Sequence, residues 1–348
     1  MNRKPYFHAW LGGFALRQES IRRIISLCLL FFLIAVFGLT SSYFLAPKNI
    51  FAFLRDASVP GILTVGVSFV IITAGIDLST GALCALSAMI IANFLYYQPG
   101  VPVPVLCAIS ILIGILGGLL NGFVVTRLRL PDFIATLATQ GIFRGLTMFF
   151  AIRESGRIRN QVIKNRAFLA FSKGVGGLFY VTIVFAVMVL IGQLLLKKTK
   201  IGVYTYATGS NRKSADLSGI PADRIKRFAF ALSGFCCGLA AIFLLARTGA
   251  ATVDLGTGLE FDVIAAVVVG GCAFSGGRGD VVGSMIGALF MAILTNGIYK
   301  YNLGSEYHVI IKGVVIIIMV LFDSVYQHWF RSRTRGAARQ ARNGKAVA

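Results

Sequence analysis

Residues 59–97 read VPGILTVGVSFVIITAGIDLSTGALCALSAMIIANFLYY, and Asp77 is the only charged residue among them. A helix needs about 20 mainly apolar residues to cross the hydrocarbon core of a bilayer. The stretch is therefore long enough for two crossings, and Ala74–Gly81 lies where one helix would end and the next begin. This pattern predicts an all-α integral membrane protein that contains broken helices.

The composition of the whole chain supports a membrane location. Of its 348 residues, 57% are hydrophobic and 14% are charged, with a mean hydropathy of +0.80. Soluble domains contain about 25% charged residues, so this composition argues against a soluble protein. The net charge of +21 raises the possibility of nucleic-acid binding. The basic residues lie between apolar runs, however, as expected for cytoplasmic loops of a membrane protein.

Apolar runs divide the chain into about ten predicted spans. We expect a cytoplasmic segment at 1–25, a transmembrane domain at 26–326 and a basic cytoplasmic tail at 327–348 that contacts anionic lipid. The spans are expected near 26–46, 59–76, 82–97, 103–126, 133–152, 174–196, 228–246, 259–274, 281–299 and 309–326.

The distribution of basic residues predicts the orientation. Ten spans place both termini on one side, and with the termini inside, the cytoplasmic segments hold 22 of the 34 Lys and Arg residues. Cytoplasmic loops are enriched in these residues, so both termini are predicted to be cytoplasmic. The segment 153–173 is a local exception, because it holds six basic residues on the outer side.

The break at Ala74–Gly81 is the first candidate site. A carboxylate inside a membrane domain is costly unless it faces protein or water. Asp77 and Ser79, with Thr73 nearby, could therefore border a polar pathway at a broken helix. Alternatively, Asp77 or Ser79 caps the helix that follows. The two roles are compatible.

The second candidate site is residues 256–279, which begin just before the span expected at 259–274. Glu260 and Asp262 fall in a first helical turn, where negative charge complements the helix dipole. They could equally form a polar lining or gate at the mouth of a pore. The Gly-rich stretch after them lacks the G-x-x-x-x-G-K-[ST] pattern of a phosphate-binding loop, which occurs nowhere in the chain. ATP binding by that mechanism is therefore not expected.

The segment 197–227 is the largest charged internal stretch. Residues 207–220 could form a short polar helix that ends near Gly219 and docks into a groove on a soluble partner. An ordinary solvated loop is the alternative interpretation.

Four segments in this order resemble the permease subunits of ribose-type ABC sugar importers, within the branched-chain amino acid and ribose permease superfamily. They are residues 75–79 (GIDLS), 130–137 (LPDFIATL), 209–220 with its Ser218-Gly219-Ile220, and 256–279 followed by Gly283 and Gly287. The resemblance covers about residues 26–325. Phe261 and residues 272–274 depart from the usual pattern, which leaves the solute open.

The resemblance implies an importer architecture of ten helices in the bacterial inner membrane, with no cofactor, metal or catalytic residue of its own. It implies a second permease copy as homodimer or heterodimer, a cytoplasmic ATP-binding cassette subunit and a periplasmic solute-binding protein. The solute would be a small polar compound such as a ribose-like sugar or a related furanosyl compound. The residues expected at the ATPase contact are Asn211, Arg212, Ala215, Asp216, Gly219 and Ile220. Those expected along the translocation path are Thr73, Asp77, Ser79, Thr136, Glu260 and Asp262.

Two other functions compete with this interpretation. In an ion-coupled secondary transporter, Asp77, Glu260 and Asp262 would be the coupling carboxylates. A membrane-embedded enzyme is disfavoured, because the sequence contains no nucleophile elbow and no metal-ligand spacing among its histidines and cysteines.

Overall fold

The computed structural model describes residues 5–41, 43–152, 160–299 and, near the C-terminus, 307, 310–315, 317–318 and 321. The chain divides into two compact units, Met1–Asn302 and Leu303–Ala348. The described residues of the second unit are helical, and most of them fall within the span expected at 309–326. The rest of that span and the tail at 327–348 lie outside the described residues.

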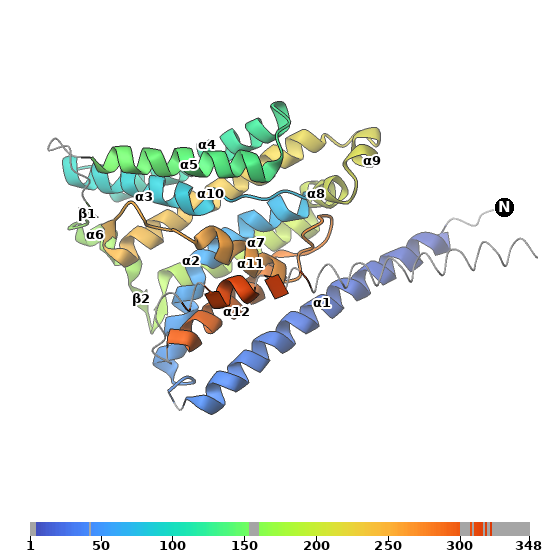
Figure 1. Ribbon diagram of the computed structural model, residues 1–348, viewed down its shortest axis with the longest axis horizontal. Coiled ribbons are helices and arrows are strands. Elements are labelled where there is room, and N and C mark those ends of the chain that lie inside the picture. Colours follow the sequence, from blue (N-terminus) through green and yellow to red (C-terminus); the bar gives the residue numbers. More distant parts are fainter. Residues whose placement is uncertain are drawn as a thin grey trace, which may run out of the picture. The chain divides into compact units, whose positions relative to one another are not determined.

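The first unit is almost entirely helical (Figure 1). Its longer helices are α1 (Pro5–Thr40), α2 (Pro47–Ile72), α3 (Thr80–Tyr97), α4 (Val103–Arg127), α5 (Asp132–Ala151), α7 (Tyr180–Lys198), α10 (Ala222–Thr248) and α12 (Val281–Tyr299). The shorter helices are α6 (Arg166–Leu169), η1 (Ala170–Ser172), α8 (Lys200–Ser210), α9 (Arg212–Leu217) and α11 (Leu259–Val269). Strand β1 (Gln161–Val162) pairs antiparallel with β4 (Ala250–Ala251), and β2 (Gly174–Val175) pairs with β3 (Leu178–Phe179).

Among the described residues, eight helices are long and apolar enough to cross a membrane. They correspond to eight of the expected spans, which confirms the all-α membrane fold. The expected span at 259–274 is wrong as a continuous helix, because α11 has 11 residues and would extend only about 16 Å. Residues 270–280 after it form turns, bends and irregular backbone. The chain therefore has a half-length helix where the sequence predicted a full crossing.

Other predicted boundaries are also corrected. The first span was expected at 26–46, whereas α1 begins at Pro5 and ends at Thr40. Helix α2 begins at Pro47, twelve residues before the expected start, and so includes Arg55 and Asp56. Asp56 pairs with Arg247 at 2.9 Å, which explains why these charges do not end the helix. The expected span at 174–196 begins late, because its first residues form the β2–β3 hairpin.

Helices α4 and α10 pack closely along their length, and glycines make this possible. A Cβ on Gly114 would lie 2.1 Å from the carbonyl oxygen of Gly234, and one on Gly118 would lie 2.2 Å from that of Phe230. Ser110 donates a hydrogen bond of 2.7 Å to the carbonyl of Gly238 across the same contact. Small residues at this spacing let helix backbones touch in lipid.

Helix α12 uses glycines in the same way against α11. A Cβ on Gly287 would lie 1.8 Å from the carbonyl oxygen of Ala266, and one on Gly283 would lie 2.1 Å from that of Gly270. The start of α12 is fixed by Asp280, which accepts a hydrogen bond of 2.7 Å from the Gly283 N–H. Arg23 of α1 pairs with the other oxygen of this carboxylate, which fastens α1 to the turn before α12.

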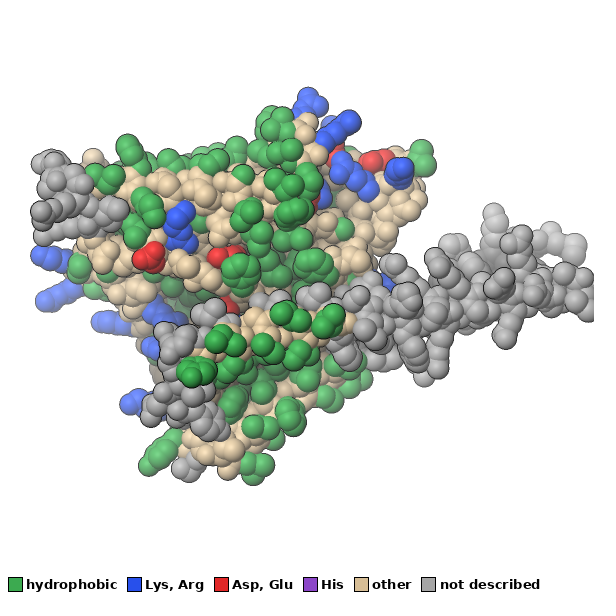
Figure 2. Space-filling model, in the orientation of Figure 1, with side chains coloured by type: hydrophobic (Ala, Val, Ile, Leu, Met, Phe, Trp, Pro, Cys, Tyr) green, Lys and Arg blue, Asp and Glu red, His purple; other side chains and the backbone are tan. Residues whose placement is uncertain are grey.

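The two ends of the helical bundle differ from its middle. Hydrophobic side chains cover much of the middle of the face in Figure 2, while basic side chains gather beside α9 at one end and near β1 and α6 at the other. We call these the α9 end and the β1 end. An apolar middle between two charged ends is the surface expected of a protein that crosses a bilayer.

Candidate functional site

The first candidate site is the break between α2 and α3. Residues 75–79 are extended or irregular, and Ala74 adopts a left-handed φ of 57° at the point where the chain leaves α2. Asp77 is 2% exposed and accepts two hydrogen bonds at Oδ1, from the Ser79 N–H at 3.0 Å and the Ser79 hydroxyl at 2.7 Å. Ser79 occupies the cap position of α3 without a side-chain cap bond. The carboxylate therefore stabilises the turn before the helix.

Helices from three other parts of the chain extend this cluster. Ser233 of α10 donates to Asp77 Oδ2 at 2.8 Å, and Asn121 of α4 donates to the Ser79 hydroxyl at 2.7 Å. Thr139 of α5 donates to the side-chain oxygen of Asn121, Oδ1, at 2.6 Å. We call these five side chains the break network. Because all are buried, each polar group relies on the others for its hydrogen bonds.

Thr136 also joins α5 to the break. Its hydroxyl lies 3.2 Å from the carbonyl oxygen of Ile76 and 2.9 Å from that of Asp132. Of the predicted path residues, Asp77, Ser79 and Thr136 thus meet at one place. Thr73 does not join them, because its hydroxyl donates to the Val70 carbonyl of its own helix at 2.8 Å.

The break between α2 and α3 contacts a second break, the turn that follows the half-length helix α11. The Gly277 N–H donates to the carbonyl of Ile72 at 2.8 Å, and Gly276 lies directly against Ala74. Gly209, at the end of α8, packs so closely that a Cβ there would lie 1.7 Å from the same Ile72 carbonyl oxygen. The ends of α2, α8 and the turn after α11 therefore meet where no side chain larger than hydrogen fits.

Glu260 marks the second candidate site, at the start of α11. It is 3% exposed, accepts a hydrogen bond of 3.1 Å from Gln140 of α5, and lies against Gly81 in the first turn of α3. Arg144, one turn further along α5, donates to the carbonyls of Val253 and Leu255 at 2.7 and 2.9 Å. Helix α5 therefore holds both the turns before α11 and the acid at its start.

Asp262 lies in the first turn of α11 with Glu260, as predicted, and is partly exposed. Two carboxylates at this position suit the positive end of the helix. The second site is centred on the start of α11, whereas the break network is centred on Asp77 and Ser79. The two candidate sites thus share α3 and α5 as walls, but they form two clusters.

The segment 211–220 forms a compact cap at the α9 end. Asn211 accepts a hydrogen bond of 3.0 Å from the Ser214 N–H and so caps α9. The helix ends with Gly219 at a left-handed φ of 78°, and the Ile220 N–H returns to the Ala215 carbonyl at 3.0 Å. These are the bonds of a Schellman motif, so the predicted helix end near Gly219 is confirmed. The helix is shorter than the predicted 207–220, because extended backbone at Asn211 separates α9 from α8.

The residues predicted to contact the ATPase differ in their exposure to solvent. Asn211, Arg212, Asp216 and Gly219 are exposed, Ile220 is partly exposed, and Ala215 is 4% exposed because it faces the rest of the chain. Leu217 is 90% exposed and was not predicted. An isolated leucine within a charged helix was the only sequence signal for it.

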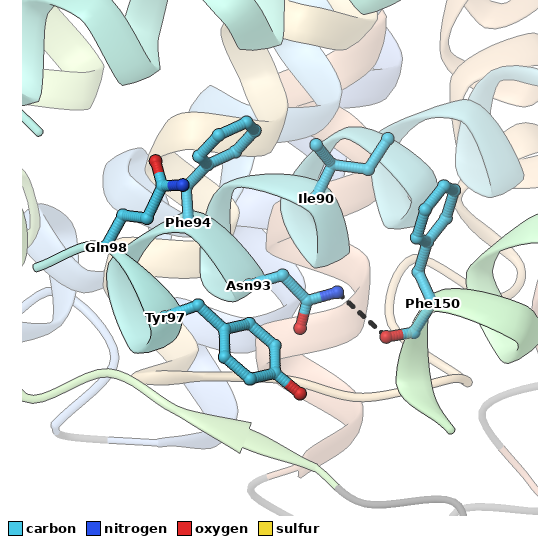
Figure 3. Close-up of a pocket in the computed structure, with 6 residues that line it drawn as sticks. All are labelled: Ile90, Asn93, Phe94, Tyr97, Gln98 and Phe150. Carbon is cyan, nitrogen blue, oxygen red and sulfur yellow. Dashed lines mark hydrogen bonds between the residues drawn. The ribbon is translucent and has the colours of Figure 1, made fainter. Parts of the chain in front are cut away.

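A pocket of about 300 Å³ lies at the C-terminal end of α3, towards the β1 end. Figure 3 shows its lining residues, Ile90, Asn93, Phe94, Tyr97, Gln98 and Phe150, with the Asn93 amide donating to the Phe150 carbonyl at 2.8 Å. Its aromatic and amide groups lie at helix ends, where such side chains favour the membrane interface. It is separate from both breaks.

Eight membrane-length helices, a half-length helix and buried polar clusters at helix breaks, all within the described part of the chain, define a polytopic membrane transport protein. The chain matches, over residues 49–320, the family described as "Branched-chain amino acid transport system / permease component". It belongs to this family. It is accordingly a permease subunit of an ABC transporter, and the chemistry of ATP hydrolysis is not its own.

Several permeases are similar to this chain along most of their length. Ribose import permease protein RbsC of Haemophilus influenzae is 36% identical over 317 residues, covering 90% of this chain and 95% of the relative. RbsC of Bacillus subtilis is 38% identical over 295 residues, covering 84% and 90%. The D-allose transport system permease protein AlsC of Escherichia coli is 35% identical over 294 residues, covering 84% and 88%. No solved structure matches the chain.

Proposed function

We propose that this chain forms the translocation path for a monosaccharide such as ribose in an ATP-driven importer of the bacterial inner membrane. Its partners would be a second permease copy, cytoplasmic ATP-binding cassette subunits and a periplasmic binding protein that delivers the sugar. Both termini would be cytoplasmic, which puts the α9 end inside. The names of its relatives, which include ribose and D-allose permeases, support the choice of solute.

The observation that carries this proposal is the pair of helix breaks surrounded by buried polar groups. Irregular backbone at membrane depth is tolerated only where protein buries it or water reaches it. In transporters such breaks accompany solute sites near the middle of the bilayer. Asp77, Ser79, Thr136, Glu260 and Asp262 would then border the path, and Thr73 would support the end of α2.

The second copy would contact the outer face of α5. A Cβ on Gly141 or Gly145 would meet no heavy atom within 4 Å, although the glycines of α4 and α10 pack in pairs. The exposed side chains beside them include Leu137 and Phe149. A Gly-x-x-x-Gly pattern on an open apolar face fits close approach of another helix. That helix would belong to an identical or closely related permease.

The ATPase would bind the segment 211–220. Its exposed Leu217 would enter an apolar pocket of the partner, and Asn211, Arg212, Asp216, Gly219 and Ile220 would surround that anchor. Interface energy commonly concentrates in one central apolar residue with a polar rim. Ala215 is buried, so it would not contact the partner and would instead hold α9 against the rest of the chain.

Uptake in proteoliposomes tests the proposal. The permease would be reconstituted with its cognate ATPase and binding protein, and radiolabelled D-ribose, D-allose and D-xylose would be offered outside. We expect uptake of one of these sugars that requires internal ATP and the binding protein and survives ionophores. Uptake that persists without ATP and collapses with an ion gradient would establish the secondary transporter instead, with Asp77, Glu260 and Asp262 as its coupling acids.

A further inference from the structure

Helix α10 carries three polar residues on one face that leads from the coupling segment, residues 211–220, into the membrane domain. Asp223, Lys226 and Ser233 are separated by three and seven residues, spacings that place side chains on the same side of a helix. Ser233 reaches the break network through its hydrogen bond to Asp77. Lys226 is 9% exposed, which is unusual for a lysine and requires a partner.

That partner is Asp132, the first residue of α5. Its Oδ2 lies 2.8 Å from Lys226 Nζ, and the side chains of Lys226 and Asp132 are 11% and 13% exposed. A Cβ on Gly75 would lie 2.5 Å from the same oxygen. The carboxylate of Asp132 therefore packs against the backbone of the break. One turn later on α5, Thr136 holds the neighbouring Ile76 carbonyl.

The other end of this face is fastened to the coupling segment. Arg212, in the first turn of α9, pairs with Asp223, in the first turn of α10. Only residues 218–221 separate the two helices. A displacement of α9 therefore reaches α10 both through this short connection and through the ion pair.

We propose that Lys226 and Asp132 form a transmission pair, which carries movement of the coupling segment through α10 to the start of α5 and the break at Gly75. This inference rests on the proposed function, because it assigns residues to the ATP-driven step. Side chains in plain packing contact can push one another, but they separate when pulled. An ion pair at 2.8 Å, shielded from water, resists separation as well, so it links the helices in both directions.

The test uses the double variant K226M/D132N in the full complex with ATPase and binding protein. Removing one charge leaves the other buried and unpaired, which can unfold the chain for reasons unrelated to transmission. Replacing both avoids this, because neutral side chains of similar size often preserve stability. The matched control is R247M/D56N, which removes the ion pair at the opposite end of the same α10.

Two measurements are needed. The first is sugar taken up per ATP hydrolysed, for which we expect at least a tenfold fall in K226M/D132N and less than a twofold change in R247M/D56N. The second is hydrogen exchange with trapped nucleotide, which needs no sugar. In the unmodified complex, nucleotide should alter exchange at both 211–220 and 73–79. In K226M/D132N it should alter exchange at 211–220 alone.

The results distinguish this inference from the proposed function. Uptake per ATP and exchange at 73–79 that remain as in the unmodified complex would show that the pair is only structural. Absence of ATP-dependent sugar uptake in the unmodified complex would instead overturn the proposed function. The hydrogen-exchange comparison would then still decide whether the pair links the coupling segment to the break.

Discussion

Ser233 of α10 donates a hydrogen bond of 2.8 Å to Asp77 in the break between α2 and α3, although 156 residues separate them in the chain. This bond joins the most buried carboxylate of the site to the helix that begins at the coupling segment. The break is thus held by helices on several sides, and its stability depends on groups that are far apart in sequence.

Asp77→Ala should destabilise the purified permease by about 1–3 kcal/mol, because the hydroxyls of Ser79 and Ser233 lose their acceptor while remaining buried. A thiol-reactive dye that reports exposure of the buried cysteines would follow thermal unfolding in detergent. Ser233→Ala removes a single bond and should have a smaller effect. Equal midpoints for Asp77→Ala and the unmodified protein would show that the network contributes nothing to stability.

Gly234→Val should prevent the α4–α10 contact from forming. The new Cβ would lie 2.1 Å from the carbonyl oxygen of Gly114, and backbone there cannot move aside as a side chain can. We expect a loss of about 3 kcal/mol or more, seen as a low yield of monodisperse protein after membrane extraction. Gly100→Ala is the control, because nothing lies within 4 Å of a Cβ at that position. A normal yield of Gly234→Val would contradict this packing.

Leu217→Glu should weaken binding of the ATPase, whereas Ala215→Glu should destabilise the permease itself. Leu217 is 90% exposed, so its replacement should leave the melting midpoint unchanged and reduce co-purification of the ATPase by roughly tenfold or more. Ala215 is 4% exposed, so a glutamate there should lower the melting midpoint of the permease itself. If Leu217→Glu retains the ATPase, the proposed anchor is wrong.

Gly141→Leu combined with Gly145→Leu should weaken association between permease copies and spare the fold of each copy. Both positions are open in this structure, so the first atoms of the added side chains meet nothing within the chain. Cross-linking in membranes should show fewer dimers, with a melting midpoint close to that of the unmodified protein. Leu112→Phe enlarges an exposed side chain on α4 and serves as the control. Unchanged cross-linking would exclude this face of α5 as the contact.

Much of the fold could be predicted because apolar length reports membrane crossing directly. The span at 259–274 could not, since its composition is equally apolar whether the segment is one helix or a half helix followed by a buried turn. The difference lies in backbone conformation. Gly271, Gly276, Gly277 and Gly279 all adopt positive φ, and they keep the chain after α11 from continuing as a helix. Their clustering was visible in the sequence, but its consequence depended on what packed against them.

The candidate site could be predicted only in part. Asp77 and Glu260 stood out because a carboxylate in an apolar run is costly unless it is paired. Asn121, Thr139 and Ser233 did not, because a single amide or hydroxyl within a span indicates only that some partner exists. Which helix supplies that partner is decided by tertiary packing. The same applies to Lys226, whose burial is not apparent from the charged segment that contains it.

The glycine contact between α4 and α10 has a mechanical consequence. Where two backbones touch, no layer of side chains lies between them that could shift rotamers and absorb a displacement. Helices α4 and α10 should therefore move as one rigid body, and α4 also contributes Asn121 to the break network. A tilt of α10 would then displace two walls of the break together. Side chains between the two helices would not absorb the movement.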